Sequence, residues 1–537
     1  TNPNNPTGED GFFYFRPTST IGPRTSNIES DTTRAVVGIN GDIPFLDNWQ
    51  YELSYLYTRV NSDVVTDSVW NLARFIRISD PELCAVDSQC AQVVNSSGAL
   101  DTFRPGNWTQ DEIAYMRQTS HSLSKFQTTS WQAIADGSLW EGWAGMWNMA
   151  VGIDQRREYG YNKPDSITEA GESVANQVFT TEGRYDVSEI FGELDIPLLI
   201  DVPLVQDLRL NLQYRYFDYS NFGSDDVYRV GLNWQMTEWL RLRGNVSTAF
   251  RAPQVTDLFG GGTVSFDFFN DPCQGPEPGS NAYQNCLLDG LDPETFIQPT
   301  SQYAVLAGSN PNLEPETADT WTAGLVLTPT GALEGLQITF DVWDIEVENL
   351  ITRPTSDSVL NDCYNGPVGL TAPECDNFDG RNPANGTPLN FVNRLTNLSG
   401  VETNGYDFSI NYARAFGSTF WNFILNGTYV DENTFYPFAG GADGRGSIPD
   451  LQTLFAVSMG WKDWNFRWNM RYVGSMDDPD FDGDNAFNYD GVGAYDIHDI
   501  RASLNLGRWR LMAGINNLFD EDPPYVFNSG NNTDTFL

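Results

Sequence analysis

Near its C-terminal end, one segment of the chain alternates strictly between large apolar and polar side chains. Trp464, Phe466 and Trp468 occupy even positions, whereas Arg467 and Arg471 occupy odd ones. Successive side chains of a strand point to opposite faces, so the segment predicts a strand with one apolar and one polar face. Aromatic residues on one face and arginines on the other are typical of a barrel wall with lipid outside and a watery lumen inside. We therefore expect such segments to close on themselves as a cylinder.

The same two-residue period recurs along most of the chain. A half-buried sheet of a soluble protein also alternates in this way, so the prediction depends on the repetition and not on any single segment. Sixteen strands are predicted, near residues 34–41, 48–60, 126–136, 145–158, 184–196, 206–218, 226–235, 238–250, 317–328, 335–347, 403–414, 418–431, 450–461, 464–474, 494–506 and 508–518.

The connections between these predicted strands alternate between short and long. Short turns include residues 236–237, 462–463 and 507–508, whereas long connections include residues 61–125 and 251–316. Hairpins joined in this way place the short turns at one end of the sheet and the long loops at the other. Outer-membrane barrels have this asymmetry, with short periplasmic turns and long extracellular loops. The sequence thus predicts an all-β fold, a transmembrane antiparallel β-barrel.

Composition argues against three other classes of protein. No stretch approaches the roughly 20 consecutive apolar residues of a membrane-spanning helix, so a helical membrane protein is excluded. The formal net charge of −42 over 537 residues argues against nucleic-acid binding, which needs a basic surface. Two histidines and no nucleophile or phosphate-binding motif leave no catalytic constellation, so we expect no enzyme.

Six cysteines form three pairs that are close in sequence, all in segments without a strand pattern. Metal binding would favour histidine ligands or closer cysteine spacing, so disulfide bonds that staple loops are the expected role. Such disulfides imply an oxidising compartment. Proximity alone suggests the pairs Cys84–Cys90, Cys273–Cys286 and Cys363–Cys375.

A series of short motifs, in this order and spacing, resembles the TonB-dependent outer-membrane receptors. Each motif is modest alone, but together they are specific and cover most of residues 34–522. The motifs are IFGELDIPLL at 190–199, YRYFDYS at 214–220, WLRLRG at 239–244, FRAP at 250–253 followed by Leu258 and Phe259, NPNLEPE at 310–316, and NNLFD at 516–520.

The resemblance implies part of a 22-stranded barrel, whose lumen the family fills with a plug. Residues 34–522 would form the barrel and residues 1–33 an extracellular loop segment. Residues 523–537 would be a last extracellular loop that leads to an absent terminal strand. The family's plug domain and TonB box are not identified in this sequence either, so we expect the chain to be the larger part of a transporter.

The resemblance also implies a function in the outer membrane of a Gram-negative bacterium, in contact with its lipid. Such a receptor captures a scarce, bulky ligand and imports it with energy from the TonB–ExbB–ExbD complex, which would act through the absent N-terminal part. No cofactor is required, and siderophore, cobalamin, glycan and peptide remain open as ligands. The alternatives are a passive porin-like channel and a secreted all-β glycan-binding protein or adhesin.

The predicted long loops are rich in aromatic residues beside asparagine and aspartate. Aromatic faces supply apolar area and amides fix hydroxyl groups, a combination that suits sugars or aromatic ligands. Packing of the loops on their own aromatic residues is the alternative. The candidate ligand contacts are Phe266, Phe268, Phe269, Tyr283, Tyr303, Tyr436 and Phe438.

Another predicted loop contains the run DPDFDG at residues 478–483. It matches the first half of a calcium loop, with carboxylates at alternate positions and then a glycine for a sharp turn. Tyr489 stands where the closing glutamate would be expected, so a solvated acidic loop is the alternative. The candidate ligands of a structural Ca²⁺ ion are Asp478, Asp480, Asp482 and Asp484.

Overall fold

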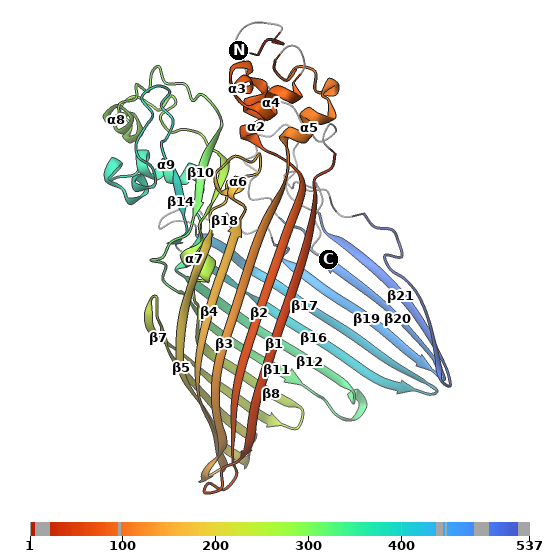
Figure 1. Ribbon diagram of the computed structural model, residues 1–537. Helices are drawn as coiled ribbons and strands as arrows, with labels where there is room; N and C mark the ends of the chain where they lie inside the picture. The colour runs from red at the N-terminus through yellow and green to blue at the C-terminus, as the bar shows by residue number, and fades with distance from the viewer. Residues whose placement is uncertain are drawn as a thin grey trace.

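One large antiparallel sheet forms most of the computed structural model (Figure 1). The structure describes residues 2–5, 22–94, 98–398, 400–436, 444–445, 448–476, 493–522 and 524. The strands of the large sheet are β1 (Thr25–Asp42), β2 (Trp49–Trp70), β3 (Arg117–Gly142), β4 (Gly145–Pro164), β5 (Thr181–Val202), β6 (Val205–Tyr219), β7 (Gly223–Thr237), β8 (Leu240–Arg251), β11 (Glu316–Leu327), β12 (Leu336–Glu348), β16 (Gly400–Phe416), β17 (Thr419–Tyr436), β18 (Gly444–Arg445), β19 (Leu451–Trp461), β20 (Trp464–Val473), β21 (Tyr495–Leu506) and β22 (Trp509–Ile515).

The long strands follow one another around the sheet in chain order. Each pairs antiparallel with the next, from β1–β2 to β21–β22, and the two-residue β18 adds to the end of β17. All sixteen predicted strands are present, which confirms the antiparallel, all-β fold. Among the described residues β1 pairs only with β2, and β22 only with β21. Within these residues the sheet is therefore open, which agrees with the prediction of part of a larger barrel; closure of the whole cylinder stays a prediction.

Several strands extend further toward the long loops than predicted. β1 begins at Thr25, so the boundary predicted at residue 34 is too late; β2 continues to Trp70, and β3 begins at Arg117. Residues 25–33 carry polar side chains on both faces except at Ile28, yet they pair with β2 along their whole length. The alternation between apolar and polar residues marks only the part of a strand that faces lipid, so it misses these extensions.

The cross-strand register separates the two faces of the sheet. Arg243, Asn233 and Arg209 stand opposite one another on β8, β7 and β6, and Arg243 forms a two-pronged ion pair with Asp341 of β12 at 2.6 and 2.8 Å. We call this polar face the lumen face. On the opposite, outer face, Trp464 and Phe466 are 38% and 39% exposed.

Helices and short strands lie mainly at the long-loop end (Figure 1). None of the helices within the described residues is both long and apolar enough to cross a membrane. The helices are α2 (Leu72–Ser79), α3 (Pro81–Val86), α4 (Ser88–Val93), α5 (Gln110–Met116), α6 (Ser166–Glu169), α7 (Val255–Phe259), α8 (Asn281–Leu288) and α9 (Ser356–Asn365), with short 3₁₀ turns at Pro105–Asn107, Gly331–Leu333, Gly369–Thr371 and Pro373–Asn377. The short strands are β9 (Thr263–Phe268), β10 (Gln302–Gly308), β13 (Leu350–Thr352), β14 (Val392–Arg394) and β15 (Thr396–Leu398).

Candidate ligand-binding site

The loops between β8 and β11 and between β12 and β16 fold together as one unit, which we call the loop body. Its centre is a three-stranded sheet in which β10 pairs antiparallel with β9 and parallel with β14. Because β14 comes from the second loop, this pairing joins the two loops through their backbones. α8 and α9 cover one face of the sheet, where Val305, Leu360 and Tyr364 are fully buried.

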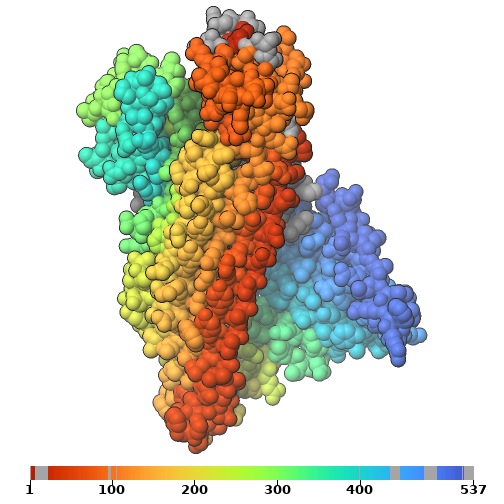
Figure 2. All heavy atoms as spheres, viewed as in Figure 1, coloured from red at the N-terminus to blue at the C-terminus, as the bar shows by residue number. Residues whose placement is uncertain are grey.

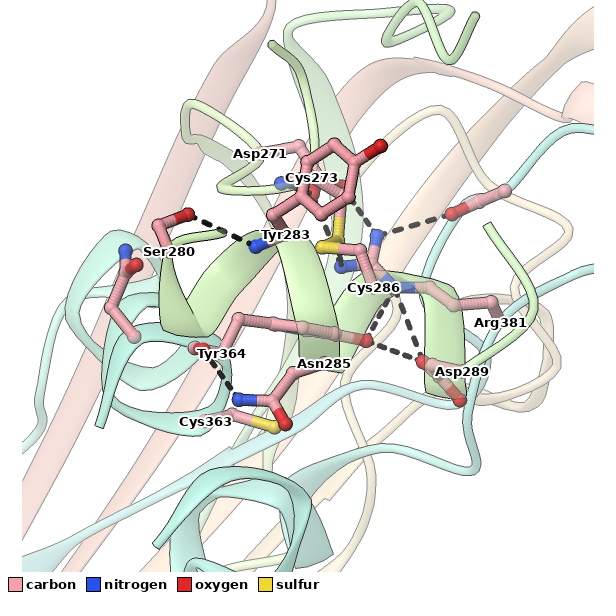
Figure 3. The surroundings of a disulfide bond; sticks show 12 residues. Asp271, Cys273, Ser280, Tyr283, Asn285, Cys286, Asp289, Cys363, Tyr364 and Arg381 are labelled. Carbon is pink, nitrogen blue, oxygen red and sulfur yellow. Dashed lines mark hydrogen bonds and ion pairs between the residues drawn. A yellow bond between two sulfur atoms is a disulfide. The ribbon is translucent and has the colours of Figure 1, made fainter. Parts of the chain in front are cut away.

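A buried ion pair ties the two loops together inside the loop body (Figure 3). Asp271 belongs to the first loop and Arg381 to the second, and their side chains are 0% and 2% exposed. Arg381 also donates to the hydroxyl of Tyr364 at 2.8 Å, and Tyr364 donates to Asp289 at 2.5 Å. Burial alone would lower the pKa of Arg381, but its hydrogen bond with Asp271 raises that pKa above the usual value, so the guanidinium stays charged.

Disulfides staple the loops at the same end of the sheet. Cys273–Cys286 and Cys363–Cys375 lie in the two halves of the loop body, and Cys84–Cys90 joins α3 to α4 in the loop between β2 and β3. All three predicted pairings are confirmed. No cysteine in the chain is left free.

The structure separates the predicted aromatic contacts into two groups. Phe266 and Phe268 occupy alternate positions of β9 and are 54% and 69% exposed, on the sheet face away from α8 and α9. Phe269 and Tyr303 are instead 3% and 8% exposed, and their rings stack with centroids 4.5 Å apart. In this conformation Phe266 and Phe268 are open to a ligand, whereas Phe269 and Tyr303 form part of the loop core.

Of the remaining predicted aromatic residues, Tyr283 lies elsewhere in the loop body. The hydroxyl of Tyr283, on α8, donates to Glu294 at 3.1 Å. Tyr436 is the last residue of β17, and Phe438 lies outside the described residues. The four predicted calcium ligands, Asp478, Asp480, Asp482 and Asp484, also lie outside them. Among the residues that are described, no group of three or more His, Cys, Asp or Glu side chains is arranged to hold a metal ion.

Residues 165–180, between β4 and β5, connect the loop body to the loop between β2 and β3. We call them the strap. At one end Ser173 pairs with Asn71, and at the other Val178 pairs with Thr263 at the start of β9. The strap lies between the two loop structures, which appear as separate projections at the top of Figure 2. The pairing is non-local and leaves no pattern in the sequence of the strap, so sequence reasoning missed it.

Two of the motifs meet below the loop body. Arg251, from the FRAP motif, forms a two-pronged ion pair with Glu316, the last residue of the NPNLEPE motif, at 2.7 and 2.5 Å. Glu316 also accepts a hydrogen bond from the backbone N–H of Ile351, at the start of the second loop. α7 follows the FRAP motif and packs against β5, where Phe259 lies over Gly183. The motifs thus fix the points at which the long loops leave the sheet.

Solved structures of similar fold share little sequence with this chain. They include the ferric enterobactin receptor PfeA of Pseudomonas aeruginosa, which has a TM-score of 0.51 and 11% identity; the match covers 92% of this chain and 66% of that one. The ferric-catecholate import receptor Fiu from K12 E. coli has a TM-score of 0.50 and 14% identity, over 92% of this chain and 60% of that one. The copper transporter OprC has a TM-score of 0.50 and 13% identity, over 92% of this chain and 61% of that one. At such identities the likeness concerns the fold alone.

A family model places the chain more specifically. No curated protein sequence matches it. The model described as TonB dependent receptor-like, beta-barrel matches residues 1–518, which is nearly the whole chain. This match agrees with the antiparallel sheet, the loop asymmetry and the order of the motifs. The chain therefore belongs to the TonB-dependent receptor family, whose members are proteins of the Gram-negative outer membrane.

Proposed function

We propose that the chain captures a scarce, bulky ligand on its extracellular loops and that the intact receptor imports it with energy from the TonB–ExbB–ExbD complex. The observation that carries the proposal is the exposed face of the loop body. Phe266 and Phe268 present two aromatic rings there, although the same loops bury Phe269 and Tyr303. Two large exposed aromatic residues on one strand are typical of a surface that gains a partner.

The loop body is built to hold this face in one conformation. Two disulfides, the buried Arg381–Asp271 pair and the β10–β14 pairing fix it before any ligand arrives. A preformed surface loses less conformational entropy on binding than a flexible loop does. Below it, the lumen face carries ion pairs such as Arg243–Asp341 and Arg215–Glu189, which suit a wet passage for a polar ligand.

The chemical class of the ligand is a further part of the proposal. PfeA and Fiu are named for ferric enterobactin and ferric catecholates, and OprC for copper. These names favour a siderophore or a copper ligand, and cobalamin, a glycan and a peptide are tested beside them. The loop between β8 and β11, residues 252–315, contains eight acidic residues and no lysine or arginine, which disfavours strongly anionic complexes.

Uptake by cells that produce the intact receptor tests the proposal. Radiolabelled ferric siderophore, cyanocobalamin, oligosaccharide and peptide would each be supplied to cells with and without TonB. We expect one ligand class to accumulate only when TonB is present, and Phe266→Ala with Phe268→Ala to weaken its binding roughly tenfold or more. Leu288→Ala is the matched control, because Leu288 is 76% exposed on α8, on the other side of the loop body.

Two results would contradict the proposal. Accumulation that does not depend on TonB would favour a passive channel. Equal binding by the double phenylalanine variant and the Leu288→Ala variant would remove the exposed face of β9 from the ligand site.

A further inference from the structure

One edge of the three-stranded sheet in the loop body is only partly paired. β9 is an outer strand of this sheet, so its N–H and C=O groups point alternately toward β10 and toward the free edge. The N–H of Val264 donates to the carbonyl of Gln177 in the strap, on the side away from β10. The N–H of Phe269, directly after β9, instead donates to the carbonyl of Ser301, directly before β10. Even-numbered residues of β9 therefore point their backbone groups to the free edge.

The protein itself satisfies the two ends of this edge. At one end the strap binds both the carbonyl of Gly262 and the N–H of Val264. At the other end, just past β9, the N–H of Asn270 donates to the carboxylate of Asp357 at 2.8 Å. The edge thus begins at a backbone partner and ends at a side-chain partner.

The middle of the edge is left open between these two ends. Within the described residues 262–270, the N–H groups of Phe266 and Phe268 donate to no protein atom. The carbonyl of Phe266 accepts a bond from Gln302 Nε2 at 3.2 Å, which leaves it a second lone pair. A row of unpaired N–H and C=O groups on an outer strand is a template for pairing with another strand.

The surroundings of this edge favour a single strand over a folded partner. The strap leaves β9 after Gln177 and continues to Ser173, which pairs with Asn71 in the loop between β2 and β3. The free edge is thus on the side of the loop body that is turned toward that loop, where the two projections of Figure 2 stand beside each other. A slender, extended chain fits such a place, whereas a globular protein or a second copy of the receptor would meet the neighbouring projection.

Side chains along the edge indicate which peptide fits. Residues of an added strand that lie opposite Phe266 and Phe268 would place their side chains beside the two rings, which favours apolar side chains. The residue between them would lie opposite Asp267, on the other face of the sheet. The Asp267 carboxylate accepts hydrogen bonds from Ser265 at 2.5 Å and from Ser356 at 2.6 Å.

The charge at the edge favours a basic side chain at that middle position. Asp357 adds a second carboxylate at the end of the edge, in the first turn of α9. Arg353 donates to the carbonyls of Asn393 and Gly308 at 3.2 and 3.0 Å, and in the described structure it forms no ion pair with Asp267. A cation from outside can therefore pair with this carboxylate.

We propose that the free edge of β9 binds an extended peptide in which a basic residue lies between two apolar ones. The peptide adds a fourth strand to the sheet, and its backbone exchanges hydrogen bonds with Phe266 and Phe268. Its apolar side chains lie beside the two rings, and its basic side chain lies beside Asp267. Because the bonds involve the backbone of β9, the site holds whether or not the rings bind the ligand proposed above.

Binding of a synthetic peptide to the intact receptor, purified in detergent, tests the proposal. The probe is acetyl-Thr-Val-Lys-Val-Thr-amide with a fluorescent label, followed by fluorescence anisotropy. The comparison is the same peptide with both valine nitrogens methylated, which keeps every side chain but cannot donate to β9. We expect the methylated form to bind roughly tenfold more weakly, and a peptide with glutamate in place of lysine to bind roughly fivefold more weakly.

A pair of variants isolates one backbone donor of the edge. Phe268→Pro removes this N–H, and Phe268→Ala is the matched control because it removes the same ring and keeps the N–H. Proline is tolerated on an outer strand where the missing N–H faces away from the sheet. We expect Phe268→Pro to bind the peptide roughly fivefold more weakly than Phe268→Ala. Hydrogen exchange of the α9 amides checks that both variants keep the loop body folded, and the comparison of the two peptides needs no variant.

Four outcomes would overturn the proposal. Equal binding of the peptide and its methylated form would show that the backbone of the peptide is not used. Equal binding by the two folded Phe268 variants would show the same for β9. Equal binding of the lysine and glutamate peptides would remove Asp267 from the site. Self-association of the receptor that the peptide abolishes would identify a second copy as the partner of this edge.

Discussion

Arg381 and Asp271 form a two-pronged ion pair inside the loop body although they are 110 positions apart in the chain. Each belongs to a different long loop, so the pair fixes how the two loops sit against each other. A buried charge that loses its partner is costly, whereas replacing both charges together is often nearly neutral. The pair is therefore better understood as selecting one arrangement of the loops than as adding stability.

The first prediction concerns this pair. Arg381→Met should destabilise the loop body by about 3–5 kcal/mol, because it leaves the Asp271 carboxylate buried without a cation. Arg381→Met combined with Asp271→Asn should recover much of that loss. Hydrogen exchange of the α9 amides measures both effects. Equal exchange in the single and double variants would show that the unpaired charge is not the cause.

The second prediction concerns the junction of the two motifs. Arg251→Met should destabilise the receptor by about 1–3 kcal/mol, because the Glu316 side chain is only 9% exposed and would keep an unpaired charge. Glu316→Gln should cost less, since its amide oxygen can still accept from Ile351 and Arg251. Thermal unfolding followed by circular dichroism checks the order of the two variants. A larger loss in Glu316→Gln would contradict it.

The third prediction concerns pH. Burial, and to a lesser degree the nearby Glu374, raises the pKa of Asp362 on α9 above 3.8. The folded loop body thus binds this proton more readily than the unfolded chain does, and the ionised carboxylate destabilises it at neutral pH. Asp362→Asn should therefore slow hydrogen exchange of α9 at pH 7, and the difference from wild type should shrink as the pH falls toward 3.8.

An exposed carboxylate provides the control for that experiment. Asp376 lies in the same loop body, and Asp376→Asn should leave exchange of α9 nearly unchanged at both pH values. A stabilisation by Asp362→Asn that persists undiminished at low pH would point to packing and not to charge.

The fourth prediction is the calcium site. If Asp478, Asp480, Asp482 and Asp484 bind Ca²⁺, adding the ion should protect residues 475–493 from proteolysis, because the ion ties together the backbone segments that supply the carboxylates. Asp480→Asn should weaken this protection, whereas Asp443→Asn, outside this run of carboxylates in the sequence, should not. Proteolysis that is equally fast with Ca²⁺ and with a chelator would leave only a solvated acidic loop.

The alternation of side chains predicts where the chain crosses lipid and little else. It locates all sixteen long strands, because each must turn apolar residues such as Phe466 outward and polar residues such as Arg467 inward. It underestimates β1 and β3, whose ends beyond the lipid band are polar on both faces. Backbone hydrogen bonds to the neighbouring strand hold those ends in the sheet. Such bonds leave no periodic pattern of apolar side chains in the sequence.

The candidate site was harder to predict because its contacts are distant in sequence. Phe266, Phe268, Phe269 and Tyr303 are equally aromatic, and only the fold decides which two are exposed. That decision depends on α9 covering one face of β9 and β10, and α9 comes from the second loop. The cysteine pairs, in contrast, are close in sequence, and proximity was enough to find them.

The strap joins the loop body to its neighbour through backbone groups: Phe179 donates to the carbonyl of Gly262, and Leu72 donates to that of Glu172. Such bonds do not depend on side-chain identity. Exposed residues of the loop body and of the loop between β2 and β3 can therefore be replaced during evolution. The backbone hydrogen bonds of the strap, which connect the two, are kept. A receptor built in this way can acquire a new ligand without having to reinvent the framework that presents it.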